Sequence, residues 1–222
     1  MTNFENSAII IFAKLPAAGK VKTRLAAEIG NNFATEFYKN CAAHIFNEVS
    51  QLKKHGIDCY LFYGIDDNIS EVKKWVDKNF IYNPQSYGNL GNKMSQAFQN
   101  VFAHGKKKVI IVGTDIPDLT KKILMNAFKL LEENDLVISP SHDGGYVLLG
   151  MKNYYPELFE NIEWSTEEVF SKTTDKIKEL GLNVKIEERL CDIDNQTDLM
   201  KWLSESDTGN IKLKNTISEL LK

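Results

Sequence analysis

The amino-acid sequence predicts an α/β fold with a mainly parallel sheet covered by helices on both faces. Two patterns support this prediction. Short, continuous apolar runs, which are typical of buried strands, alternate with longer segments whose apolar residues recur every three or four positions. Because helical segments separate the strands along the chain, neighbouring strands can lie parallel to one another. The expected strands cover residues 8–12, 59–64, 109–112, 136–139 and 146–151.

Three segments have the apolar period of a helix packed on a core. They cover residues 33–52, 90–102 and 123–131. Residues 183–189 alternate Val184 and Ile186 with charged side chains, which is typical of a strand at the edge of a sheet. No repeat or linker divides the chain. We therefore expect a single domain over residues 1–222, with a polar helical tail at about 205–222.

Composition and charge exclude several classes of protein. The chain has 222 residues, with 27 lysines and arginines against 30 aspartates and glutamates, and its net charge is -3. It therefore offers no overall attraction for nucleic acid or membranes. The first residues lack an apolar run long enough for a signal peptide or a membrane span. Three scattered cysteines without metal-ligand spacing indicate a reduced, cytoplasmic protein.

Asp115 follows closely on the apolar run at 109–112, in the segment VIIVGTD. In an open α/β sheet, ligands bind beyond the carboxyl ends of the strands, so this carboxylate stands at a favoured position for a site. Two interpretations remain open. Asp115 either caps the turn that contains Pro117, or it faces a ligand at the edge of the sheet.

A basic loop follows the first expected strand. Pro16 and Gly19 prevent a regular helix there, so cations and backbone amides can surround an anion. It is not a Walker A loop, because Val21 occupies the position of the magnesium-binding Ser or Thr. A solvated run of charge is the alternative, but the position directly after a buried strand favours phosphate binding. The cations of the loop are Lys14, Lys20, Lys22 and Arg24.

Two later segments carry further candidate site residues. In SHDGGYVLLG, Asp143 precedes Gly144 and Gly145, and paired glycines let a ligand approach the backbone closely. A tight turn between strands is the alternative. In CDIDNQTDL, one of three aspartates is expected to cap a helix that starts near Thr197, so at most two are available for a site.

Six segments, in a fixed order along the chain, carry a family resemblance. They are FAKLPAAGKVKTRLA, GNLGNKMSQAF, VGTDIPDLT, SHDGGYVLLG, WSTEEVF and DIDNQTDL. The set resembles a bacterial GT-A-like family of unknown function, whose members are often labelled selenodomain-associated transferases or glycosyltransferases. More distantly, the chain resembles the nucleotide-diphospho-sugar transferase superfamily. This resemblance implies a GT-A fold, a Rossmann-like three-layer α/β/α sandwich with a mainly parallel mixed sheet.

The resemblance also implies a site. Asp115 matches a carboxylate that holds a divalent metal, Mg²⁺ or Mn²⁺, on a diphosphate, and Asp194 matches a second acidic position used for the metal. The fold would keep these two carboxylates close, and they would repel each other until the metal binds. Lys22 and Arg24 would neutralise the leaving diphosphate during catalysis. The residues expected to bind the nucleotide are Lys14, Gly19, Lys20, Lys22, Arg24, Gly91, Gly144 and Gly145.

Three functions remain open from the sequence. The leading hypothesis is a metal-dependent glycosyltransferase that uses a nucleotide-activated sugar and a small acceptor. The alternatives are a nucleotidyltransferase, which releases pyrophosphate from a nucleoside triphosphate, and a nucleotide-binding module without turnover. Asp143 is the candidate general base for the acceptor hydroxyl, with Glu167 as second choice.

Overall fold

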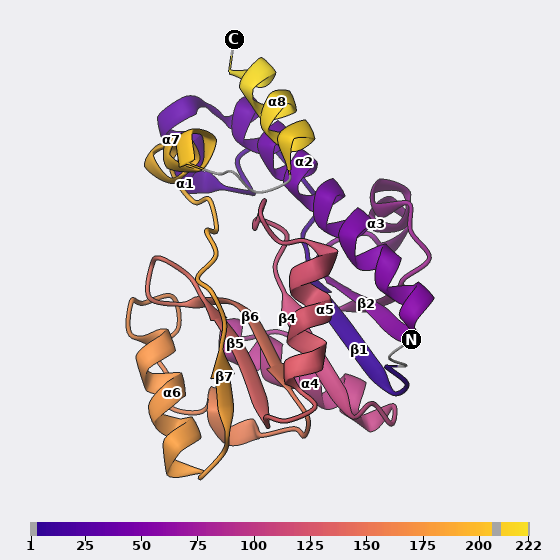
Figure 1. Ribbon diagram of the computed structural model, residues 1–222. Helices are drawn as coiled ribbons and strands as arrows, with labels where there is room; N and C mark the ends of the chain where they lie inside the picture. The colour runs from indigo at the N-terminus through magenta and orange to yellow at the C-terminus, as the bar shows by residue number, and fades with distance from the viewer. Residues whose placement is uncertain (1–3, 206–209, 222) are drawn as a thin grey trace.

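A seven-stranded sheet forms the centre of the protein in the computed structural model, which describes residues 4–205 and 210–221 (Figure 1). The strand order is β3-β2-β1-β4-β6-β5-β7, and β6 is antiparallel to both of its neighbours. All six predicted strands are present, and the mixed, mainly parallel sheet confirms the predicted fold class. The strands are β1 (Ser7–Phe12), β2 (Ile57–Tyr63), β3 (Ile81–Pro84), β4 (Lys108–Val112), β5 (Leu136–Pro140), β6 (Tyr146–Met151) and β7 (Val184–Ile186).

Helices cover both faces of this sheet. The apolar sides of α2, α3 and α5 pack on one face, and those of α4 and α6 pack on the other. The three predicted helices correspond to α2, α4 and α5, and the C-terminal end of the first continues into a short 3-10 helix (Gln51–His55). The α-helices are α1 (Thr23–Ile29), α2 (Asn31–Ser50), α3 (Ile69–Val76), α4 (Leu90–Ala103), α5 (Lys121–Leu130), α6 (Val169–Glu179), α7 (Gln196–Glu205) and α8 (Ile211–Leu220).

The central strand β1 shows why the sheet needs helices on both sides. Successive side chains of a strand point to opposite faces, so Ile9 packs with α2 whereas Ile10 packs with Phe98 of α4. Both isoleucines are fully buried. Burial of such a side chain contributes roughly 1.5 to 3 kcal/mol to folding. The continuous apolar run of β1 therefore specifies a strand in the middle of a three-layer sandwich.

A third apolar cluster joins α1, α7 and α8 to the N-terminal half of α2 (Figure 1). Because α1 begins directly after Lys22 and α7 directly after Asn195, this cluster brings the two segments before these helices to the same edge of the sheet. The predicted tail at about 205–222 lies partly outside the described residues, since 206–209 and 222 are not described. Its described part forms α8, which buries Leu213 and Ile217 in the cluster.

Within residues 4–205 and 210–221, no helix combines the length and the apolar character needed to cross a bilayer. All three cysteines are free thiols. Cys41 and Cys59 are buried, whereas Cys191 is half-buried.

Candidate functional site

A cavity of about 560 Å³ opens at the carboxyl ends of β1 and β4. Its volume lies in the range of small-molecule sites. Five cations and three carboxylates line it, so the lining is net positive although the whole chain has a net charge of -3. The cavity is therefore suited to a polyanionic ligand. Its charged lining residues are Lys14, Lys20, Lys22, Arg24, Lys93, Asp115, Asp192 and Asp194.

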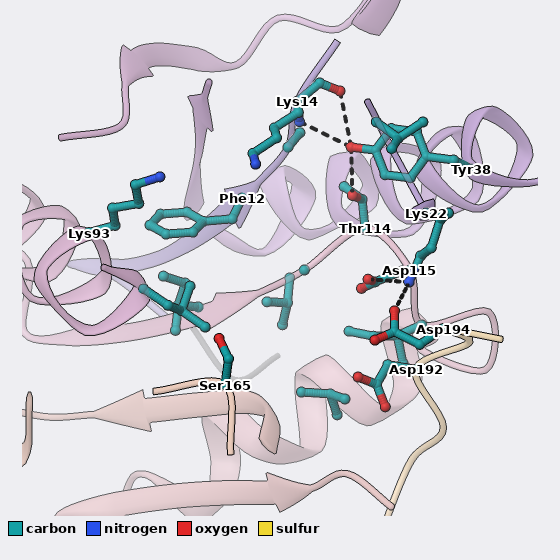
Figure 2. Close-up of a pocket in the computed structure, with 18 of the residues that line it drawn as sticks. Phe12, Lys14, Lys22, Tyr38, Lys93, Thr114, Asp115, Ser165, Asp192 and Asp194 are labelled. Carbon is teal, nitrogen blue, oxygen red and sulfur yellow. Dashed lines mark hydrogen bonds and ion pairs between the residues drawn. The ribbon is translucent and has the colours of Figure 1, made fainter. Parts of the chain in front are cut away.

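Lys22 lies between the two carboxylates that the sequence assigned to a metal (Figure 2). Its Nζ donates to Asp115 Oδ2 at 2.7 Å and to Asp194 Oδ1 at 2.7 Å, and its side chain is only 5% exposed. The backbone of Lys22 is left-handed, with φ 48° and ψ 49°. This conformation is strained for a residue with a side chain and persists only where the surroundings fix it. The two ion pairs of the Nζ hold the Lys22 side chain in place and so help to keep this backbone conformation.

The predicted repulsion between Asp115 and Asp194 in the metal-free protein is wrong. The fold does keep the two carboxylates close, but the Lys22 ammonium lies between them and neutralises their mutual repulsion. Burial alone would lower the pKa of Lys22, yet the charges of both carboxylates outweigh it and hold that pKa above its ordinary value. Burial would likewise raise the pKa of Asp115, but Lys22 holds it below its ordinary value. Lys22 and Asp115 are therefore both charged at neutral pH.

Tyr38 of α2 joins the basic loop to the end of β4 (Figure 2). Its hydroxyl accepts a hydrogen bond from the Lys14 N–H at 3.0 Å and donates to the Lys14 carbonyl at 3.0 Å. It also accepts from Thr114 Oγ1 at 3.2 Å. One buried hydroxyl thus holds both the start of the loop and the residue before Asp115. Sequence reasoning missed Tyr38, because beside Phe37 it looks like another core residue of a helix.

The structure brings six of the predicted site residues to the cavity. Arg24 is the most exposed of the residues that contact its acidic wall, with a side chain 72% exposed and Nη1 3.5 Å from Asp194 Oδ2. Such a side chain can reach a ligand without first leaving a buried partner. The six are Lys14, Lys20, Lys22, Arg24, Asp115 and Asp194.

The predicted glycines lie outside the described lining of the cavity, and protein segments contact two of them. A Cβ atom on Gly91 would lie 2.1 Å from Trp164 Nε1. Gly144 has a φ of +89°, and a Cβ atom there would lie 2.1 Å from the carbonyl oxygen of Glu167. At these two positions, the missing side chain leaves room for the segment after β6 and not for an open cavity. The ligand contacts predicted for the glycines, Gly19, Gly91, Gly144 and Gly145, stay predictions.

The two candidate bases, Asp143 and Glu167, are also outside the described lining. Asp143 Oδ1 closes a turn, accepting hydrogen bonds from Ser141 Oγ and from the Gly145 N–H. Asp192 lines the cavity instead, and sequence reasoning gave it no role. Burial, and then the charges of Asp143 and two other aspartates, raise the pKa of Asp192 to about 7. The signal for Asp192 was its place two residues before Asp194.

Asp192→Asn is expected to stabilise the metal-free protein above pH 7. A carboxyl group whose pKa is higher in the folded state binds more protons when folded, so stability falls as pH rises from about 4 to about 7. Asn cannot ionise and should raise the free energy of unfolding at pH 8 by about 1 to 2 kcal/mol, with little change at pH 4. Urea denaturation in EDTA measures this, with the exposed Asp175→Asn as control. The same pH dependence in Asp192→Asn and wild type would contradict the prediction.

The fold of the whole chain defines the class of protein. The fold matches that of a proposed nucleotide-diphospho-sugar transferase from Desulfovibrio desulfuricans G20 with a TM-score of 0.88 and 28% identity, over 98% of this chain and 97% of the other. The 4-diphosphocytidyl-2C-methyl-D-erythritol synthase from Anaerococcus prevotii has the same fold, with a TM-score of 0.58 and 13% identity over 95% of this chain and 100% of that one. The protein thus has a nucleotide-diphospho-sugar transferase fold.

The family follows from the sequence itself. Residues 48–166 match the DUF2064 family, described as uncharacterized proteins conserved in bacteria, and the chain belongs to this family. A 2-phospho-L-lactate guanylyltransferase from Methanocaldococcus fervens is 30% identical over 133 residues, which are 60% of this chain and 56% of that protein. The match therefore spans little more than half of that relative. These findings confirm the predicted resemblance.

Proposed function

We propose that this protein is a metal-dependent nucleotidyltransferase, which transfers a nucleotide from a nucleoside triphosphate to a small acceptor and releases pyrophosphate. The observation that carries the proposal is the buried ammonium of Lys22, held between Asp115 and Asp194 in a positively charged cavity. The identity to a guanylyltransferase supports nucleotidyl transfer over the glycosyl transfer that the sequence suggested first.

The position of the cations suits a triphosphate. The basic loop follows β1 and Asp115 follows β4, and these two strands are neighbours in the sheet. Phosphates bound by the loop would therefore lie beside the carboxylate. Pyrophosphate gains negative charge as it leaves, and fixed cations stabilise that charge in the transition state. Lys22, Arg24 and Lys20 are the cavity residues that would do so.

The donor set also suits Mg²⁺ or Mn²⁺. Mg²⁺ is usually held by one or two carboxylates together with substrate phosphates, and Asp115 and Asp194 would be the two carboxylates. In the part of the chain that the structure describes, no three side chains of the metal-binding kinds converge on one point. The nucleotide would therefore have to supply the remaining oxygen ligands. When bound, the metal would withdraw charge from the phosphate oxygens.

The acceptor needs a group that takes its proton. Among the described residues, Lys22 donates hydrogen bonds to Asp115 and Asp194 but not to Asp192, the third carboxylate of the cavity. Asp192 lies on the same wall as Asp194 (Figure 2). In the proposed step the acceptor oxygen attacks the α-phosphorus, its proton passes to Asp192, and the bond to pyrophosphate breaks. Asp143 is the alternative base, because it is near enough to Asp192 to raise its pKa.

Glycosyl transfer from a nucleotide sugar is the second candidate. It is favoured by the neighbour from Desulfovibrio desulfuricans G20, whose resemblance covers nearly the whole of both chains. The same cations and metal ligands would then stabilise a leaving nucleoside diphosphate. The two candidates differ in their product, since one releases pyrophosphate and the other a nucleoside diphosphate.

A ligand screen followed by product detection tests the proposal. Nucleoside triphosphates and nucleotide sugars should raise the melting temperature more with Mn²⁺ than without it, because a ligand of the native state adds to its stability. Incubation with small phosphorylated or hydroxylated acids should then release pyrophosphate. Release of a nucleoside diphosphate would favour glycosyl transfer, and no stabilisation by any nucleotide would contradict both.

Arg24→Ala is expected to weaken nucleotide binding by about 1 to 3 kcal/mol, the size of a charge-assisted hydrogen bond to phosphate. Folding should be nearly unaffected, because the Arg24 side chain is 72% exposed. Calorimetric titration measures the affinity, with Lys178→Ala on α6 as the control for loss of an exposed cation. If Arg24→Ala and Lys20→Ala both bind nucleotide like the wild type, the basic loop is not the phosphate site.

A further inference from the structure

We infer that Lys22 and the divalent cation compete for Asp115 and Asp194, so that metal binds well only when nucleotide is present. The inference rests on the proposed function and extends it to the order and coupling of binding. The Lys22 Nζ is 2.7 Å from an oxygen of each carboxylate, and so occupies the position between the two groups that would hold the metal.

Electrostatics makes simultaneous occupancy unfavourable. The Lys22 ammonium neutralises one of the two carboxylates, so Lys22, Asp115 and Asp194 together carry a single negative charge, which makes a weak site for a dication. A metal brought between the same oxygens would meet a positive charge at hydrogen-bond distance, and like charges at that distance repel strongly in a partly buried site. Lys22 therefore lowers metal affinity as long as it remains between Asp115 and Asp194.

The nucleotide provides a second position for the ammonium. Lys22 lines the same cavity as Lys14, Lys20 and Arg24, where the triphosphate would bind. Its long, flexible side chain can turn from the carboxylates to a phosphate oxygen. That movement frees the carboxylates for the metal and gives the ammonium a new anionic partner. Metal and nucleotide then favour each other's binding, and such coupling is reciprocal.

The other cations near this position do not have the same arrangement. Arg24 approaches only Asp194, at 3.5 Å, from an exposed position. Lys20 lines the cavity and has no ion pair with a described residue. It belongs to the same loop and carries the same charge, so Lys20→Met is a matched control for Lys22→Met.

Mn²⁺ titration without nucleotide tests the competition directly, with free Mn²⁺ measured by electron paramagnetic resonance. Lys22→Met keeps most of the length of the side chain and removes its charge. It should bind Mn²⁺ about ten- to a hundredfold more tightly than wild type, the usual range of coupling between ligands. Lys22→Arg and Lys20→Met should bind Mn²⁺ like the wild type. Equal affinity in folded Lys22→Met and wild type overturns the inference.

Coupling in the wild type tests the inference without any variant, should Lys22→Met not fold. A non-hydrolysable nucleoside triphosphate analogue should raise the affinity of the wild-type protein for Mn²⁺, after correction for the metal–nucleotide complex in solution. Independent binding of Mn²⁺ and nucleotide overturns the inference and the metal dependence of the proposed function, whereas release of pyrophosphate would still support nucleotidyl transfer. Absence of nucleotide binding at any Mn²⁺ concentration overturns both.

Discussion

Asp115→Asn is expected to remove the metal-dependent part of nucleotide binding and to lower turnover by about a thousandfold, or about 4 kcal/mol in the transition state. Asn preserves the shape of the side chain but has no charge to hold a dication. It also leaves Lys22 with a single carboxylate partner, Asp194. Calorimetric titration of nucleotide with and without Mn²⁺, on variant and wild type, measures the first effect.

The stability of Asp115→Asn shows whether Asp115 is the ion-pair partner of Lys22 or only caps a turn. Because the Lys22 ammonium is buried, loss of one of its two carboxylates should lower the free energy of unfolding by about 1 to 3 kcal/mol. The repulsion between Asp115 and Asp194 that was expected from the sequence would instead give no loss of stability, or a slight gain, because it does not take Lys22 into account. A residue that merely caps a turn tolerates Asn almost without effect. Full metal-dependent affinity in Asp115→Asn would contradict the metal-ligand role.

Gly144→Ala is expected to destabilise the protein by about 3 kcal/mol or more, through backbone strain and overpacking together. Gly144 has a φ of +89°, which side-chain-bearing residues rarely adopt, and the added Cβ would lie 2.1 Å from a backbone oxygen of Glu167. The Phe170 N–H also donates to the Gly144 carbonyl at 2.8 Å, so the two segments cannot simply separate. Denaturant unfolding measures the change.

Gly145→Ala is the matched control for this prediction. Its added Cβ would lie 3.1 Å from Ser141 Oγ, a side-chain atom and not the backbone, and no positive φ adds strain. The expected loss of stability is about 1 kcal/mol or less. Similar losses in Gly144→Ala and Gly145→Ala would show that the contact with Glu167 is not what requires glycine at position 144.

The elements that were predicted share a strong local signal, and two of those that were missed, β3 and α6, lack one. Strand β4 has four consecutive buried apolar residues, whereas β3 is a short edge strand with no buried residue. Helix α6 buries Val169, Thr173 and Ile177 at intervals of four. The threonine in the middle of this row interrupts the apolar pattern, so the helical period was not apparent in the sequence.

The sequence could predict those parts of the site that directly follow a strand. The basic loop and Asp115 each follow a recognisable strand, so their meeting at one edge of the sheet follows from the fold. The pairing of Lys22 with both carboxylates does not, because it depends on the packing of α1 against α7. Tyr38 and Asp192 also depend on tertiary placement. No local pattern separates Tyr38 from a core tyrosine, and the place of Asp192 two residues before Asp194 does not by itself distinguish it from a surface aspartate.

The two ion pairs of Lys22 close very long loops in the chain, of 93 residues to Asp115 and 172 residues to Asp194. Contacts between residues so far apart form late, because the chain between them must first be ordered. During synthesis, Lys22 and Asp115 can meet well before residue 194 leaves the ribosome. The acidic wall is then incomplete, so a nascent chain cannot bind its ligands until most of the sheet has been made and folded.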